Sequence, residues 1–151
     1  MLNFIYLFLF IKLMVRINLI NPKKLADQHL IAEYNEILML LGYVRKYPIE
    51  KDIPEEYCLG RGHIKFFKNK LLYLKKRHEL LKKEMSKRNF ISNKNINLGE
   101  FNKKLRNDWK PNNKDFIIIK ERIREKICLK PNYYRYYSKK RSKVFFLNLL
   151  V

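Results

Sequence analysis

The chain has 151 residues, which is enough for one domain with a modest core and argues against a second domain. Its formal net charge of +20 exceeds what solubility requires and points to a polyanionic partner, either nucleic acid or an anionic membrane surface. The aromatic content of 14% argues against a disordered basic tail, and the 4 glycines and 5 prolines favour helices over a turn-rich β fold. We therefore expect an all-α protein, a compact single domain of about three main helices with long loops.

The spacing of cysteines and histidines gives no sign of a metal site or a disulfide framework. The two cysteines, Cys58 and Cys128, lack a C-x-x-C spacing, and the three histidines, His29, His63 and His78, form no metal-binding pair. We expect no metal, no cofactor, and reduced cysteines in the core of an intracellular protein.

Residues 1–13 form an apolar run that is shorter than the ~20 residues needed to span a bilayer and lacks the features of a signal peptide. Three interpretations compete: an interfacial anchor, an extra structured segment, or a translation start placed too early. We favour the last, because Met14 is followed by the small Val15, which methionine aminopeptidase generally tolerates, and such a start would give Val15 a free α-amine. The expected organisation is an extension over 1–13, a domain over 14–141, and an apolar tail over 142–151 to which we assign no function.

The first helix is predicted over residues 22–41. Asn21 and Pro22 are a typical N-cap and first-turn pair, and Gly42 suits the C-cap position. At about 100° per residue, this helix has one apolar face, formed by Leu30, Tyr34, Ile37, Leu38 and Leu41.

Glu36 lies roughly 140° from the centre of that apolar face, so we expect it to point away from the core. His29 and the small Ala32 share its side of the helix, and a ligand could approach the helix closely at Ala32. Periodicity alone favours an ordinary solvated charge at Glu36.

Residues 43–54 are predicted to form a basic connection in which Arg45 and Lys46 are placed to meet phosphates. A second helix is predicted over residues 62–88, with an apolar face formed by Ile64, Phe67, Leu71, Leu74, Leu81 and Met85. His78 fills the gap in that face, and we expect it to be a packed or edge histidine because no titratable group accompanies it. Most cations on the other sides of this helix should be solvated.

Residues 89–113 are rich in Asn and Lys and are predicted to be a loop. Three apolar side chains in the loop are expected to tuck against the helices: Phe101, Leu105 and Trp109. A third helix is predicted over residues 115–129, with Phe116, Ile119, Ile123 and Ile127 facing inward. Arg122 and Lys126 lie four residues apart on this helix, so they share a face and can meet successive phosphates.

The segment 133–141 interleaves tyrosines with cations, a composition suited to stacking on bases together with phosphate neutralisation. Its candidate nucleic-acid contacts are Tyr133, Tyr134, Arg135, Tyr136, Tyr137 and Lys139. Packing of two or three of these tyrosines against the end of the domain explains the pattern equally well, and both interpretations stay open.

Four separated segments are distinctive: RINL at 16–19, LADQHLIAEYNE at 25–36, LGRGHIKFFKNKLLYLKKR at 59–77 and EKICLKPNYYRYYSK at 125–139. In the identity of their residues, their order and their approximate spacing, they resemble the pyrimidine-dimer DNA glycosylase family, of the phage UV-repair endonuclease V type. The resemblance implies a compact helical domain that excises UV-induced cyclobutane pyrimidine dimers from duplex DNA and cleaves the resulting abasic site without a cofactor. It assigns the nucleophile to the α-amine of Val15 and the acid/base to Glu36.

The other candidate site residues are expected to contact DNA. Outside the tyrosine segment they are Arg16, Gln28, His29, Arg45, Lys46, Arg61, Arg122 and Lys126. This chain departs from the phage-type pattern in having Asn35 and Met39 where arginines surround the glutamate, and Val15 where threonine is familiar. Arg61, which lies between two glycines, could compensate for the missing arginines.

The chemistry that the resemblance implies suits these residue types. An α-amine has a reference pKa near 8, and the neighbouring cations would lower the pKa of the Val15 amine by disfavouring a second positive charge. The neutral amine can attack C1′ of the deoxyribose, displace the base and leave an iminium. A carboxylate at Glu36 can then assist removal of the C2′ proton, so that β-elimination cuts the strand.

The expected partner is double-stranded DNA that contains pyrimidine dimers or abasic sites, bound by a monomer in the cytoplasm or nucleoid without stable membrane association. One alternative is a non-catalytic basic DNA- or RNA-binding module, which the charge and the tyrosines explain equally well. A weaker alternative is a membrane-surface protein with two apolar ends and a basic body. Glu36 together with a free Val15 amine distinguishes the enzyme from the module.

Overall fold

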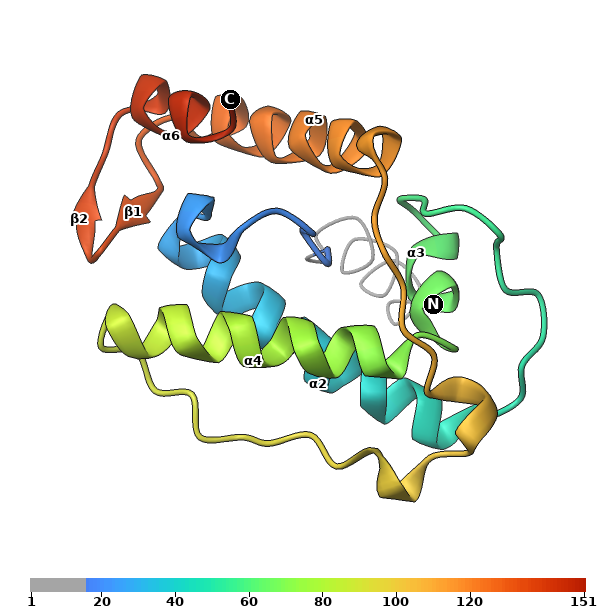
Figure 1. Ribbon diagram of the computed structural model, residues 1–151. Helices are drawn as coiled ribbons and strands as arrows, with labels where there is room; N and C mark the ends of the chain where they lie inside the picture. Colours follow the sequence, from blue (N-terminus) through green and yellow to red (C-terminus); the bar gives the residue numbers. More distant parts are fainter. Residues whose placement is uncertain (1–15) are drawn as a thin grey trace, which may run out of the picture.

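The computed structural model describes residues 16–151 (Figure 1). The extension 1–13, the start at Met14 and the nucleophile Val15 lie outside these residues. The elements are η1 (Pro22–Lys24), α2 (Asp27–Lys46), α3 (Gly62–Phe67), α4 (Leu71–Lys87), η2 (Leu98–Glu100), η3 (Lys103–Leu105), α5 (Asn113–Leu129), β1 (Arg135–Tyr136), β2 (Lys139–Lys140) and α6 (Lys143–Leu149). Helices dominate the described chain, and its sheet is one two-stranded hairpin, so the prediction of an all-α fold is confirmed in its broad form.

The first predicted helix is present, but its bounds differ. Asn21 caps the short η1 through a 3.0 Å bond to the Lys23 N–H, and α2 begins only at Asp27. Gly42 does not end α2, which continues to Lys46. A helical glycine costs about 1 kcal/mol, and burial of Val44 in the next turn outweighs that cost.

The second predicted helix is two helices, α3 and α4, separated by Lys68–Lys70. Lys70 leaves the helical conformation, with φ −122° and ψ 42°, and forms a bridge with Arg106 of the following loop. Its ammonium group donates to the Phe66 carbonyl at 2.8 Å, which satisfies an acceptor at the helix end. The break allows both Phe66 and Phe67 to be fully buried.

The core lies where α2 packs against α4, with residues 16–26 and α5 placed over this pair (Figure 1). The expected apolar faces are buried almost throughout, and His78 is fully buried between them, stacked on Tyr34 at 4.6 Å between ring centroids. The prediction of a packed histidine is therefore confirmed. Phe101 and Leu105 of the long loop are buried and Trp109 is half-buried, also as predicted.

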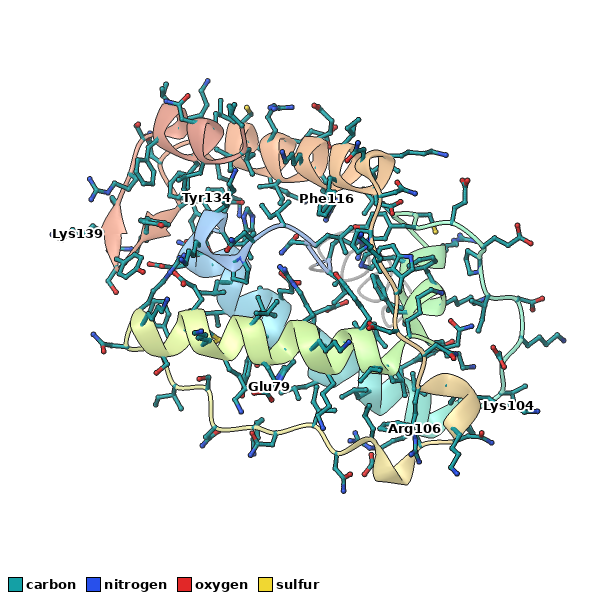
Figure 2. All side chains as sticks on the ribbon, viewed as in Figure 1. Glu79, Lys104, Arg106, Phe116, Tyr134 and Lys139 are labelled. Carbon is teal, nitrogen blue, oxygen red and sulfur yellow. The ribbon has the colours of Figure 1, made fainter. Side chains whose placement is uncertain are left out.

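Helix α5 begins two residues earlier than predicted, because Asn112 and Asp115 form a reciprocal capping box with bonds of 3.0 Å and 2.8 Å. Its inward residues Ile119, Ile123 and Ile127 are buried. Figure 2 shows side chains that extend from α5 towards the layer below it, among them Phe116.

The apolar C-terminal segment forms α6, which packs against α5. Ser142 caps this helix at its N-terminus, and Phe146 and Leu150 are buried. The Phe146 ring lies 6.0 Å from that of Tyr134, so the segment completes the core beneath the tyrosine cluster. Within residues 16–151, no helix combines the length and the apolar character needed to cross a bilayer.

Candidate active site

Residues 16–20 form an irregular segment that passes between α4 and α5 (Figure 1). Both polar groups of the Ile17 backbone are held by side chains: its N–H donates to His63 Nε2 at 3.0 Å, and its carbonyl accepts the Tyr57 hydroxyl at 3.1 Å. All three residues are buried, so water does not compete for these bonds. The beginning of the described chain is therefore fixed by residues far away in the sequence.

The next residues of the segment are held by a buried ion pair. Arg77 Nε donates to Glu33 at 2.7 Å, and the same guanidinium donates to the carbonyls of Leu19 and Ile20 at 3.1 and 2.6 Å. Glu33 also accepts the Asn18 side chain at 3.0 Å. No local sequence pattern predicts this pair, because its two charges lie 44 residues apart.

Glu36 is buried, with 4% of its surface exposed, so the interpretation that periodicity alone favours, an ordinary solvated charge, is wrong. Helix periodicity identifies the side of α2 that faces α4, but it does not show that the segment carrying Arg16 comes close on the other side. Burial raises the pKa of Glu36 to about 7, with Arg16 opposing the shift and Glu33 adding to it. Near neutral pH this carboxyl can therefore both accept and release a proton.

Glu36 also differs from the other buried carboxylates of the described chain. Asp27, Glu33, Glu84 and Asp115 each accept at least one hydrogen bond from a side chain or a backbone N–H. Within residues 16–151, the Glu36 carboxyl receives no such bond. A buried carboxyl whose pKa is raised into the neutral range is typical of a functional group.

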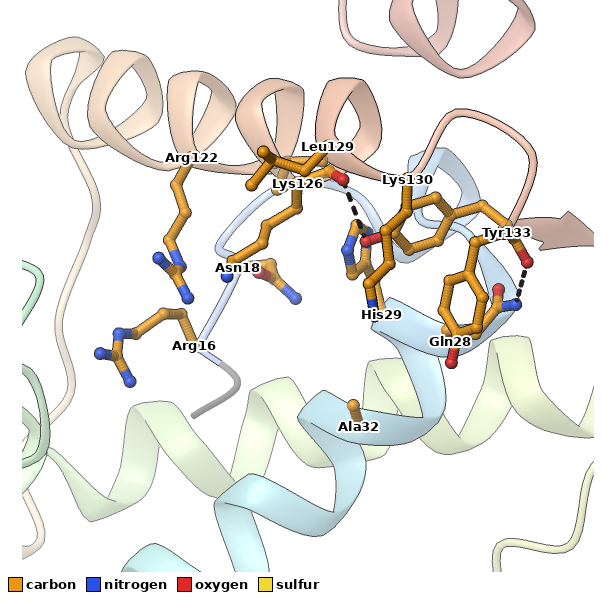
Figure 3. A pocket seen from close by; sticks show the side chains of 12 residues that line it. Arg16, Asn18, Gln28, His29, Ala32, Arg122, Lys126, Leu129, Lys130 and Tyr133 are labelled. Atoms are coloured by element: carbon orange, nitrogen blue, oxygen red, sulfur yellow. Dashed lines mark hydrogen bonds between the residues drawn. The ribbon is translucent and has the colours of Figure 1, made fainter. Parts of the chain in front are cut away.

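A pocket of about 360 Å³ lies between α2 and α5 (Figure 3). It is lined by Arg16, Asn18, Gln28, His29, Ala32, Arg122, Ile123, Lys126, Leu129, Lys130, Tyr133 and Tyr134. Arg122 and Lys126 both reach it from α5, so the prediction that they share a face is confirmed. Glu36 is not among the residues that line the pocket, but Arg16 lines it and also acts electrostatically on Glu36, so Arg16 connects the pocket with the carboxyl.

The pocket concentrates positive charge. Burial lowers the pKa of Arg16, Arg122 and Lys126, and the neighbouring cations lower the pKa of Arg16 and Lys126 further. A bound anion would offset both effects, because it favours the charged form of each group. The arrangement suits a phosphate of a nucleic acid.

His29 forms part of the pocket wall. Burial lowers its pKa to about 4, and the charges of Arg122 and Lys126 add to the shift, so the imidazole is neutral at pH 7. Its ring packs on Tyr134 with 4.7 Å between centroids. Its Nδ1 is buried and has no hydrogen-bond partner among the described residues.

Residues 14–98, more than half of the chain, match the family model described as pyrimidine dimer DNA glycosylase. The chain belongs to this family. Membership implies a partner, DNA that contains pyrimidine dimers. The matched range includes Glu36, His29 and the bonds to Ile17, whereas the resembling segment 125–139 lies beyond it.

Seven of the residues expected to contact DNA line the pocket of this glycosylase-family protein: Arg16, Gln28, His29, Arg122, Lys126, Tyr133 and Tyr134. The amide of Gln28 donates to the Tyr133 carbonyl at 2.9 Å and accepts the Arg135 N–H at 3.0 Å, so it joins α2 to the hairpin. Tyr133 is 53% exposed beside the pocket, while Tyr134 is buried. Tyr133 therefore presents an exposed ring that DNA could contact, whereas the ring of Tyr134 is packed inside the protein.

Apart from the hairpin residues, three expected DNA contacts lie away from the pocket. Arg45, near the C-terminal end of α2, forms an ion pair with Glu100, and Lys46 lies over the Tyr47 ring at 5.4 Å. Arg61 is exposed immediately before α3. None of the three lines the pocket, so any contact with DNA would be outside it.

The hairpin residues divide between packing and exposure. Tyr136 and Tyr137 lie over the buried Arg88, with 4.5 and 4.9 Å from its guanidinium carbon to the ring centroids. Arg135 and Lys139 are exposed on β1 and β2. Packing accounts for the half-buried Tyr136, whereas Tyr137 is 43% exposed and, like the two cations, keeps surface that DNA could contact.

Within residues 16–151, no group of three or more His, Cys, Asp or Glu side chains could hold a metal ion. Both cysteines are free thiols. Cys58 is half-buried and Cys128 is exposed, so the prediction that both are core residues is wrong for Cys128. That side chain lies on the outer face of α5, next to the buried Ile127.

Proposed function

We propose that this protein excises UV-induced cyclobutane pyrimidine dimers from duplex DNA and cleaves the abasic site through an imine formed by the Val15 α-amine. The observation that carries the proposal is Glu36, a buried carboxyl with a pKa of about 7 on which Arg16 of the cationic pocket acts electrostatically. The family match supports the substrate, and its beginning at residue 14 supports a chain that starts with Met14.

The nucleophile would be the neutral amine. Its lone pair attacks C1′ of the damaged nucleotide, the glycosidic bond breaks, and the base leaves with the bonding electrons. Opening of the sugar then gives an iminium between C1′ and the amine nitrogen. The cations Arg16, Arg122 and Lys126 favour the neutral form of an amine near them, because a further positive charge would be repelled.

Glu36 would act on the proton at C2′. The iminium acidifies this proton, the carboxylate removes it, and the electron pair expels the phosphate at C3′ in a β-elimination. This step requires the ionised form of Glu36. Because the pKa of Glu36 is about 7, the rate of strand cleavage should rise as the pH increases towards neutrality.

The pocket would hold the DNA next to this chemistry. The cations from α5 and Arg16 can neutralise phosphates, and Tyr133 offers an exposed ring for stacking. Access to C1′ requires local distortion of the duplex, which costs less at a damaged, weakly paired site. We expect a monomer that acts without a metal or another cofactor.

Borohydride trapping on UV-irradiated duplex DNA tests the proposal. Chains that begin at Met14 and at Met1 are compared with Glu36→Gln and with Glu55→Gln, a control at an exposed carboxylate. We expect a covalent adduct that peptide mapping places on Val15, formed only by the chain that begins at Met14 and preserved in the control. DNA binding without an adduct from any of these proteins would refute the mechanism and leave a non-catalytic DNA-binding module.

A further inference from the structure

Two residues that take no direct part in the proposed chemistry hold the backbone N–H and carbonyl of Ile17. His63 Nε2 accepts its N–H and the Tyr57 hydroxyl donates to its carbonyl. His63 is fully buried, and Tyr57 and Ile17 are buried as well. We call this arrangement the Ile17 clamp.

His63 is itself held in one tautomer. Its Nδ1 lies 2.9 Å from the Cys58 carbonyl, which can only accept, so the proton is on Nδ1 and the Nε2 lone pair faces Ile17. Burial lowers the pKa of His63 to about 3, so this pattern is retained throughout the range in which the protein would act. The imidazole therefore serves as a fixed acceptor.

The turn before α3 places His63 at this position. Gly60 has a φ of +80°, which favours glycine, and a side-chain carbon at Gly62 would lie only 2.7 Å from Cys58 Sγ. Tyr57 is packed edge-on against Phe66 and Phe67, with centroids 5.8 and 6.1 Å away. Both halves of the clamp thus rest on a rigid local structure.

We infer that His63 and Tyr57 are positioning residues that set the location of the Val15 amine through the Ile17 peptide. The inference rests on the proposed function. Two residues of chain span at most about 7 Å, so an amine at Val15 can reach no farther than that from the fixed N–H of Ile17. Reactions of this kind lose about 100-fold in rate when the reacting group is displaced by roughly 1 Å.

The test compares four variants of the chain whose wild-type form gives the adduct. His63→Phe removes the acceptor and keeps a ring, His63→Gln restores an acceptor oxygen, and Tyr57→Phe removes only the hydroxyl. The matched control is His78→Phe, because His78 is equally buried but neither of its ring nitrogens has a hydrogen-bond partner among the described residues. Thermal unfolding establishes which variants are folded.

Two quantities are measured for each variant. The first is the single-turnover rate of imine trapping on duplex DNA with an abasic site, and the second is the affinity for the same duplex with a tetrahydrofuran analogue that has no electrophilic C1′. We expect His63→Phe to slow trapping about 10- to 100-fold and Tyr57→Phe to slow it about 3- to 10-fold, with affinities within about twofold of the wild type. His63→Gln should recover most of the rate, and His78→Phe should match the wild type.

Equal trapping rates for Tyr57→Phe, His63→Phe and His78→Phe would overturn the inference, and Tyr57→Phe decides alone if His63→Phe does not fold. A parallel loss of affinity would also overturn it, because the clamp would then support the binding surface. A changed midpoint in the pH–rate profile of His63→Phe would indicate proton transfer by His63 in place of positioning. Failure of the proposed function itself is distinguishable, because the wild-type chain would then form no adduct.

Discussion

Replacing Glu36 with Gln should stabilise the protein at alkaline pH while it abolishes strand cleavage. The Glu36 pKa is about 7 in the folded chain and 4.5 is its ordinary value. Between these two pH values the folded state keeps a proton that the unfolded state releases. Glu36 therefore costs no stability below pH 4.5, and its cost grows as the pH rises through this window and is complete above pH 7.

The size of the effect follows from the same two values. Each pKa unit is worth about 1.4 kcal/mol, so the ionised carboxyl costs about 3 kcal/mol of unfolding free energy. Because only 4% of Glu36 is exposed, solvent screens little of this cost. Glu36→Gln removes the titration and keeps the shape, so its stability relative to the wild type should rise by up to about 3 kcal/mol between pH 4.5 and pH 8.

Urea unfolding at pH 4.5, 6 and 8 measures this difference. Titrations shared by the two proteins cancel when Glu36→Gln is compared with the wild type at each pH. The exposed Glu55→Gln variant should show little change across the same range. If the stability gained by Glu36→Gln is the same at pH 4.5 and pH 8, the carboxyl is not desolvated and the reasoning fails.

Three further predictions follow from other parts of the structure. Glu33→Gln should destabilise the protein by about 3–5 kcal/mol in urea unfolding, because it leaves the Arg77 guanidinium buried without its carboxylate; a loss below about 1 kcal/mol would contradict a buried pair. Lys126→Ala should lower the slope of log Kd for duplex DNA against log salt by about 1, whereas Lys83→Ala, exposed on α4, should change it less. Burial lowers the pKa of His78 to about 4, so the wild type should lose stability relative to His78→Phe as the pH falls from 6.5 towards 4. If the unfolding free energies of the two proteins change in parallel over this pH range, the pKa of His78 is not lowered.

The helix faces could be predicted from the sequence because their cause is local. The stripe Leu30, Tyr34 and Ile37 follows helical periodicity, and these side chains are buried as expected. Local signals failed where a distant contact decides the outcome. The sequence predicts a helix end at Gly42, because it does not show that Val44 packs into the core. It predicts a helical Lys70, because it does not show the bridge to Arg106.

In the candidate site, too, local features could be predicted from the sequence and distant contacts could not. The shared face of Arg122 and Lys126 was predictable from their spacing. The burial of Glu36, the Ile17 clamp and the Glu33–Arg77 pair were not, since each depends on segments brought together only by the fold. A GHI sequence after a glycine-rich turn gives no indication that its histidine accepts a bond from a peptide 46 residues earlier.

The residues of the site come from two parts of the chain, and the family match covers only one of them. Glu36, His29 and the Ile17 clamp fall within the range 14–98 that matches the glycosylase family, so the chemistry of the proposal rests on that range. The cations of α5 lie beyond it, and their role depends on the pocket that the fold builds. Because α6 packs on α5 and supports Tyr134, which in turn packs on His29, the C-terminal segment is tied to the same pocket. Changes in α6 should therefore lower DNA affinity with little effect on the rate of imine formation, and changes around Ile17 should do the reverse.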